Sequence, residues 1–172
     1  MFRALVVAAT LTATPLIAQE AEPHMTLTRM AEIVQALDAD ANITPNGFEF
    51  SIDDVPVLII ADAQANRMRA MVPISSVEGM TPEEMERVMQ ANFDSALDAR
   101  YAIARGRLWG VFIHPLKELE RDQFISGIAQ TVNVAQTYGG LYTSGAGQFG
   151  AGDSSSLQAQ LLQELLDRGE DI

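Results

Sequence analysis

Apolar residues in the first half of the chain recur at helical spacing and then at strand spacing. Apolar side chains three and four positions apart predict an amphipathic helix over residues 27–37, ending at 37 or 38. Residues 48–52 and 67–74 alternate between apolar and polar, and residues 55–61 form a continuous apolar run. Each of these three segments predicts a strand, and the short turns between them favour antiparallel pairing.

The intervening segment 38–47 contains Asn, Pro and Gly and predicts a polar turn. A second helix is predicted to begin at Thr81, because proline follows this capping residue and Glu84 stands three positions after it. Its apolar stripe is predicted to fill the core and consists of Met85, Val88, Met89, Phe93, Ala96 and Leu97.

Two short strands, 101–104 and 108–113, flank a turn of the hairpin type, and a third helix is predicted over residues 120–138. The predicted order is therefore α-β-β-β-α-β-β-α. This order indicates an α+β domain over residues 26–142, with a five-stranded antiparallel sheet and helices packed on one side of it.

Several segments of this domain resemble the YbjN family, whose domains look like type III secretion chaperones. The resemblance covers about residues 25–142 and is carried by Gly47-Phe48-Glu49-Phe50, Asp53-Asp54-Val55-Pro56-Val57, Arg105-Gly106-Arg107-Leu108-Trp109 and Pro115-Leu116. It implies a type III secretion chaperone-like fold that is often dimeric and is described as a sensory transduction regulator or chaperone-like binder. It brings no catalytic residues.

Residues 1–18 predict a secretory signal peptide that is cleaved after Ala18. Arg3 is followed by an apolar run over residues 4–17, and a polar leader occupies residues 19–25. The alternative is an N-terminal membrane anchor, which is disfavoured because the run is shorter than the ~20 residues that span a bilayer. The sequence thus predicts a periplasmic protein. In this respect the chain differs from the secretion chaperones, since they work in the cytoplasm.

Composition and motif spacing further restrict which partners and cofactors we expect. The formal net charge of −12 makes nucleic acid and anionic lipid poor partners, and the absence of cysteine excludes disulfides, thiol catalysis and zinc–thiolate sites. Residues 38–49 follow the spacing of a calcium loop, but Ile43 stands where glycine is needed. The glycine pattern at 145–150 lacks a surrounding βαβ unit. We therefore expect no cofactor, no metal and no stable membrane insertion.

The end of the chain carries an unexpected apolar stripe. A Gly/Ser-rich linker over residues 143–156 precedes a predicted amphipathic helix over residues 157–168. Its stripe consists of Leu157, Leu161, Leu162, Leu165 and Leu166. A solitary helix of this length is marginal in water, so the stripe is expected to be buried. It can fold back on its own domain, or dock into a second subunit or another protein.

Two hypotheses of function follow. The first is a non-enzymatic periplasmic protein-binding, chaperone-like or regulatory module, which binds an envelope protein or a second copy through its sheet face, a strand edge or the leucine helix. The alternative is an unrecognised hydrolase or metal-dependent enzyme. The sequence shows no nucleophile elbow and only two histidines, which favours the first. The candidate partner-binding residues are the five leucines of the stripe and Trp109. With Phe112 and Tyr101, Trp109 would form an aromatic binding patch, because aromatic side chains bury a large area in interfaces; the alternative, which the sequence favours, is that these aromatic residues pack in the core.

Overall fold

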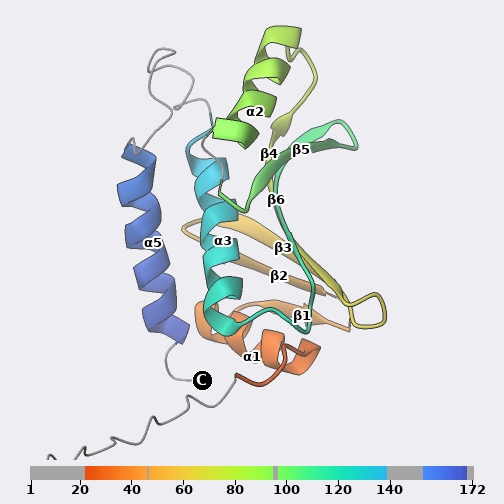
Figure 1. Cartoon of the computed structure of the whole chain (residues 1–172), viewed down its shortest axis with the longest axis vertical. Helices are drawn as coiled ribbons and strands as arrows, with labels where there is room; N and C mark the ends of the chain where they lie inside the picture. Colours follow the sequence, from red (N-terminus) through yellow and green to blue (C-terminus); the bar gives the residue numbers. More distant parts are fainter. Residues whose placement is uncertain (1–21, 46, 95–96, 139–152, 170–172) are drawn as a thin grey trace, which may run out of the picture.

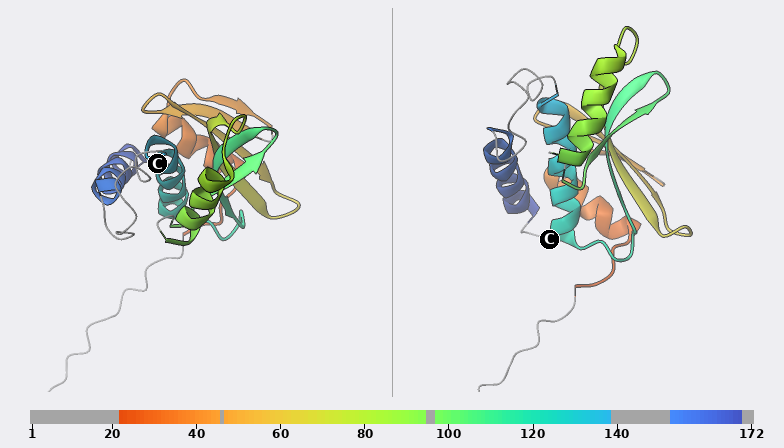
Figure 2. Two further views of the ribbon diagram at one scale, coloured as in Figure 1. Left: turned by 90° about the horizontal axis from the view of Figure 1, so that it is seen from above. Right: turned by 45° about the horizontal axis from the view of Figure 1, so that its top comes forward.

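The computed structural model describes residues 22–45, 47–94, 97–138 and 153–169, which form one antiparallel sheet and four helices (Figure 1). The elements are α1 (Leu27–Leu37), β1 (Asn42–Thr44), β2 (Gly47–Ile52), β3 (Val55–Asp62), β4 (Arg67–Ser76), α2 (Pro82–Asp94), β5 (Arg100–Ala104), β6 (Arg107–His114), α3 (Arg121–Gln136) and α5 (Asp153–Gly169). The strand order is β1-β2-β3-β4-β6-β5. The helices α1, α2 and α3 cover one face of the sheet, and α5 lies beyond α3 (Figures 1 and 2).

The sheet has six strands, so the prediction of five was wrong by one strand. The additional strand is β1, which lies in the segment that was predicted as a turn and pairs with β2 through Ile43 and Phe48. All three residues of β1 are exposed. An edge strand of this kind carries no alternation of buried and exposed side chains, which is the signal that identified the other strands.

The predicted α+β class and the order of the remaining elements are confirmed. The start of α2 agrees with its predicted capping pair: the Thr81 N–H donates to Glu84 Oε2 at 2.8 Å, and the Glu84 N–H donates to Thr81 Oγ1 at 3.2 Å. The stripe of α2 was predicted less well. Val88 and Ala91 are buried, whereas Met85, Met89 and Phe93 are exposed.

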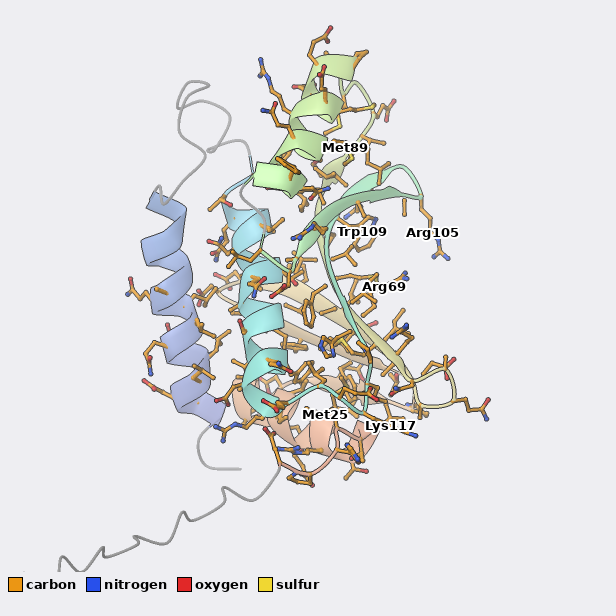
Figure 3. All side chains as sticks on the ribbon, viewed as in Figure 1. Met25, Arg69, Met89, Arg105, Trp109 and Lys117 are labelled. Carbon is orange, nitrogen blue, oxygen red and sulfur yellow. The ribbon has the colours of Figure 1, made fainter. Side chains whose placement is uncertain are left out.

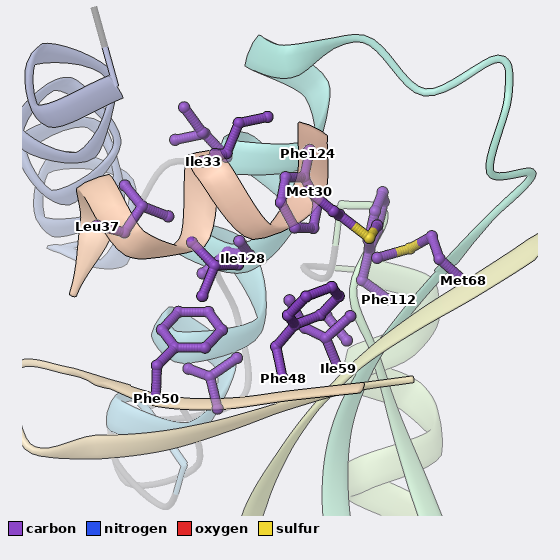
Figure 4. Close-up of a cluster of buried hydrophobic side chains, with 14 of the residues drawn as sticks. Met30, Ile33, Leu37, Phe48, Phe50, Ile59, Met68, Phe112, Phe124 and Ile128 are labelled. Carbon is purple, nitrogen blue, oxygen red and sulfur yellow. The ribbon is translucent and has the colours of Figure 1, made fainter. Parts of the chain in front are cut away.

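The main core lies between the sheet and the helices α1 and α3. The alternate residues of β2, β3 and β4 face this core, and Figure 4 shows Phe48 and Phe50 of β2 below the apolar side of α1. Met30 and Ile33 of α1 are fully buried against them. Burying one such side chain stabilises the fold by about 1.5–3 kcal/mol. The alternation therefore fixes which face of the sheet remains for other contacts.

Two glycines allow α3 to lie close to β6. A Cβ atom added to Gly110 of β6 would lie 3.1 Å from the carbonyl oxygen of Thr131 in α3. A Cβ added to Gly127 of α3 would lie 2.5 Å from two atoms of the Phe112 ring in β6. Each element thus supplies a glycine where the other approaches. A side chain at Gly110 would press on the α3 backbone, and one at Gly127 would require the Phe112 ring to shift.

Asn66 ties the β3–β4 turn to the segment between β6 and α3. Its Oδ1 accepts from the Lys117 N–H at 2.8 Å, and its Nδ2 donates to Glu118 Oε2 at 2.8 Å. Asn66 has a φ of 51°, a left-handed conformation that asparagine tolerates better than most residues. The hydrogen bond from Asn66 is the main reason that the pKa of Glu118 lies below its ordinary value, because it favours the charged carboxylate.

Replacing Gly127 by alanine tests the close approach of α3 and β6. Helix propensity alone would stabilise G127A by about 1 kcal/mol, but the clash with Phe112 is expected to destabilise it by about 1–3 kcal/mol. The free energy of unfolding, measured in urea, shows whether G127A is more or less stable than the wild type. Q136A, at an exposed position of α3, serves as the control. A G127A protein that is more stable than the wild type would contradict the packing argument.

Replacing Asn66 by alanine is expected to raise the pKa of Glu118 toward its ordinary value of 4.5. A lowered carboxyl pKa stabilises the fold above the unfolded-state pKa, and this contribution is lost as the pH falls through the folded-state pKa. The stability difference between wild type and N66A should therefore shrink on acidification below 4.5.

Carboxyl NMR titration and urea unfolding at several pH values measure these two effects. Q64A, an exposed variant of the same turn, is the control. An unchanged Glu118 titration in N66A would refute the assignment.

Candidate protein-binding surface

The face of the sheet that points away from the helices is the candidate functional surface. Figure 3 shows Arg69 and Trp109 on the side of the sheet opposite α3 and α5. We call this surface the open face. Its apolar residues, which come from β3, β4 and β6, are Leu58, Ile60, Met71, Pro73, Trp109, Val111 and Ile113. No described helix covers it (Figure 2).

The strand register sets these residues side by side. Leu58 of β3 is opposite Met71 of β4, which is opposite Val111 of β6. In an antiparallel sheet, directly opposite residues point to the same face, so the three side chains form one row. The next row toward the β5–β6 turn pairs Pro73 with Trp109. The open face therefore has a continuous apolar centre.

On the other side of this centre, Arg69 lies between two exposed isoleucines. It is paired with Ile60 of β3 and with Ile113 of β6, and each isoleucine is 54% exposed. Large apolar side chains are usually more buried than this, and a contiguous exposed group of them is typical of an interaction site. The apolar area thus extends from Trp109 to Arg69.

Trp109 is held in place by its own hairpin. Its Nε1 donates to the carbonyl oxygen of Ala104 at 3.1 Å, and the guanidinium carbon of Arg107 lies 6.0 Å from the centre of its ring. The indole N–H is already satisfied, so Trp109 offers a partner its aromatic surface. A side chain that is fixed before binding loses little conformational entropy on contact.

Four arginines lie around the apolar centre. Arg67 and Arg69 lie on β4, Arg107 lies at the start of β6, and Arg100 of β5 is opposite Val111. All four are exposed. The ion pairs found within the described part of the chain use Arg29, Arg121 and Arg168 instead. Arg67 is opposite Asp62 in the strand register, whereas no carboxylate is directly opposite Arg69 or Arg107.

The predicted leucine stripe packs within this chain. Leu161 and Leu165 are 6% and 0% exposed and belong to the main core, while Leu162 and Leu166 are half-buried against it. The Arg121 Nη1 group donates to the Gly169 carbonyl oxygen at 3.2 Å and anchors the end of α5 to α3. The side chain of Leu157 lies outside the described residues. The stripe therefore has a covering surface in its own domain.

The edge of β5 is partly occupied. The Asn92 side chain of α2 donates to the Tyr101 carbonyl oxygen at 3.1 Å and accepts from the Tyr101 N–H at 2.7 Å. A strand added to this edge would have to displace Asn92. Beside it, α2 presents Met85, Met89 and Phe93, and Phe93 is 90% exposed. This second exposed apolar surface was missed by the sequence analysis, because helical spacing does not reveal which residues lie against the sheet.

A hollow of about 570 Å³ between β6 and α3 holds the polar groups that come closest to an enzyme site. Its lining includes Asp98, His114 and Ser126. His114 Nδ1 is hydrogen-bonded to the Pro115 carbonyl oxygen, and Ser126 Oγ accepts from Gln130 Nε2. No hydrogen bond joins a serine to a histidine among the described residues. The arrangement thus offers no nucleophile that is paired with a base.

The described residues contain no group of three or more His, Asp or Glu side chains that could hold a metal ion. None of their helices is both long and apolar enough to cross a membrane. The predicted signal peptide over residues 1–18, with its cleavage after Ala18, and most of the predicted linker lie outside the described residues.

No family model and no curated protein matches this sequence. The solved structures that match it include three protein complexes. The Yersinia pestis type III secretion chaperone SycH, in complex with a stable fragment of YscM2, is 15% identical with a TM-score of 0.52 over 65% of this chain and 98% of its own. The chain therefore has a type III secretion chaperone-like fold.

The other two structures are complexes as well. The ExsC–ExsE complex is 13% identical with a TM-score of 0.46, over 57% of this chain and 77% of that chain. The HopA1–SchA chaperone–effector complex is 9% identical with a TM-score of 0.47, over 62% of this chain and 87% of that chain.

Proposed function

We propose that this protein is a non-enzymatic, chaperone-like binding module that recognises a segment of another protein through its open face. The observation that carries the proposal is the apolar surface between Trp109 and Arg69, whose central side chains are half-buried and whose Ile60 and Ile113 are each 54% exposed, because apolar side chains exposed together on one face are typical of an interaction site. The fold supports it, since SycH is a secretion chaperone seen with a protein fragment. The resemblance to the YbjN family remains a prediction, and it implies the same chaperone-like binding.

We further propose that the protein acts in the periplasm on an envelope protein. The support is the predicted signal peptide at residues 1–18, which would place the mature chain outside the cytoplasm. Loading effectors for export is a cytoplasmic task, so this location favours binding of a protein that is already exported. The location is tested by N-terminal sequencing of the mature protein, which should begin at Gln19.

The proposed binding is tested with the full mature chain. A protein captured from a periplasmic extract is purified, and its dissociation constant for the chain is measured by calorimetry. Replacing Trp109 by alanine should raise that constant about 30-fold, as expected when a central aromatic contact of about 2 kcal/mol is lost. Q160A, on the exposed side of α5, is the control and should bind like the wild type.

Two outcomes would contradict this function. One is unchanged binding by W109A while Q160A or another α5 variant loses it. The other is catalytic turnover in a panel of hydrolase assays, with and without divalent metal, that a single substitution such as H114A abolishes. The second outcome would favour the enzyme alternative and would direct attention to the hollow beside His114.

We also propose that the protein forms a homodimer through α2. Met85, Met89 and Phe93 are spaced four residues apart and are exposed along one side of the helix, which is the pattern of a helix–helix contact. A second copy of α2 in antiparallel orientation would cover the same stripe on both copies and would oppose the two helix dipoles favourably.

Light scattering of the full mature chain is expected to give the mass of a dimer. The variant M89E/F93E is expected to give the mass of a monomer, because two buried carboxylates at the contact would be desolvated. Q90E, at a neighbouring exposed position, should remain dimeric. A monomeric wild-type protein would refute this assembly without affecting the open face.

A further inference from the structure

The charge of the open face differs in sign from that of the protein as a whole. The chain has 23 acidic and 11 basic residues, yet this one face carries four arginines, Arg67, Arg69, Arg100 and Arg107, against the two carboxylates of Glu49 and Asp62. A free arginine side chain on an acidic protein commonly lies beside a carboxylate, and Arg67 has Asp62 opposite it. Arg69 and Arg107 have no carboxylate opposite them. The cross-strand neighbours of Arg69 are two isoleucines, whereas those of Arg107 are Ser76 and Ala104.

The two arginines stand at opposite ends of the apolar centre. Between Arg69 and Arg107 the register places the row of Met71 and Val111 and then the row of Pro73 and Trp109. Rows on one face of a sheet are two residues, or about 6.6 Å, apart. Arg69 and Arg107 are therefore separated by about 20 Å along the strands, which an extended peptide covers with about six residues.

We propose that the open face binds an extended protein segment that has an apolar middle and an acidic residue near each end. This inference rests on the proposed function and names the chemical class of its partner. The apolar middle would cover Met71, Val111 and Trp109. The two carboxylates would pair with Arg69 and Arg107, whose planar guanidinium groups can each donate two parallel hydrogen bonds to a carboxylate.

An acidic protein segment fits this face better than the other anions that arginine binds. Nucleic acid and anionic lipid present continuous negative charge, and the net charge of −12 repels both at long range. A short segment with two carboxylates and an apolar centre would approach the arginines locally and would also desolvate the apolar rows. Two local ion pairs at the ends of an apolar surface also fix the register of the bound segment.

The test uses a display library of random dodecapeptides selected on the full mature chain. The selected sequences are expected to carry Asp or Glu on both sides of an apolar stretch. A synthetic peptide of that consensus should bind about ten-fold more weakly to the charge-reversed variant R69E/R107E. Its binding to the wild type should also weaken as the ionic strength rises. The control R87E/K117E makes the same change of charge at exposed positions away from the face and should bind normally.

A peptide in which the acidic residues are replaced by lysine provides the reciprocal test. It should bind R69E/R107E better than it binds the wild type. Failure of this exchange would overturn the assignment of the two arginines, even if the original peptide binds.

The remaining outcomes separate this inference from the proposed function. Selection of neutral peptides that lose binding in W109A but not in R69E/R107E would overturn the inference and leave the function standing. Selection of no peptide would overturn both. Sedimentation of the wild type, but not of R69E/R107E, with phosphatidylglycerol vesicles would assign the arginines to a lipid surface and would also overturn the inference.

Discussion

The contact between α3 and β6 through Gly110 and Gly127 is the constraint on which the rest of the structure depends. Each glycine stands where the other element would otherwise meet a side chain, so the helix lies directly on the strand. Two further helices lie against this pair: Val88 of α2 belongs to one buried cluster with Val134 of α3 and Leu108 of β6, and α5 packs on α3. These helices thereby cover most of one side of the sheet, and Ile103 near the end of β5 stays 45% exposed on that side.

Filling one side determines the character of the other. Because side chains alternate along a strand, the burial of Phe112 beneath α3 directs Val111 and Ile113 to the open face. The β-bulge between Pro73 and Ser75 shifts the register of β4 against β6 and sets Ser76 opposite Arg107. The open face is therefore a consequence of the packing of the core, and its apolar centre has no covering element among the described helices.

Local signals made several elements predictable from the sequence. The capping pair of Thr81 and Glu84 identified the start of α2, and the alternation in β2 and β4 identified both strands and their buried sides. Features that depend on neighbours in the folded structure were not predictable from the sequence. Strand β1 has no buried residue, and the exposure of Phe93 depends on which side of α2 meets the sheet. Sequence periodicity alone predicts neither the edge strand nor the exposure of Phe93.

The candidate surface, too, was only partly predictable from the sequence. Trp109 was singled out from the sequence because aromatic residues are common in interfaces. Its grouping with Met71 and Leu58 requires the register of three strands, which joins residues about 50 positions apart in the chain. The leucines of α5 illustrate the opposite case. Their spacing correctly indicated a stripe that needs a cover, but only the fold shows that α1 and α3 supply it.

Site-specific photo-crosslinking in living cells tests the open face most directly. A benzophenone amino acid is placed at Ile113, on the open face, or at Gln160, on the exposed side of α5. Protein binding at the open face predicts a crosslinked partner from position 113 and none from position 160. A partner that crosslinks from position 160 but not from position 113 would contradict the account.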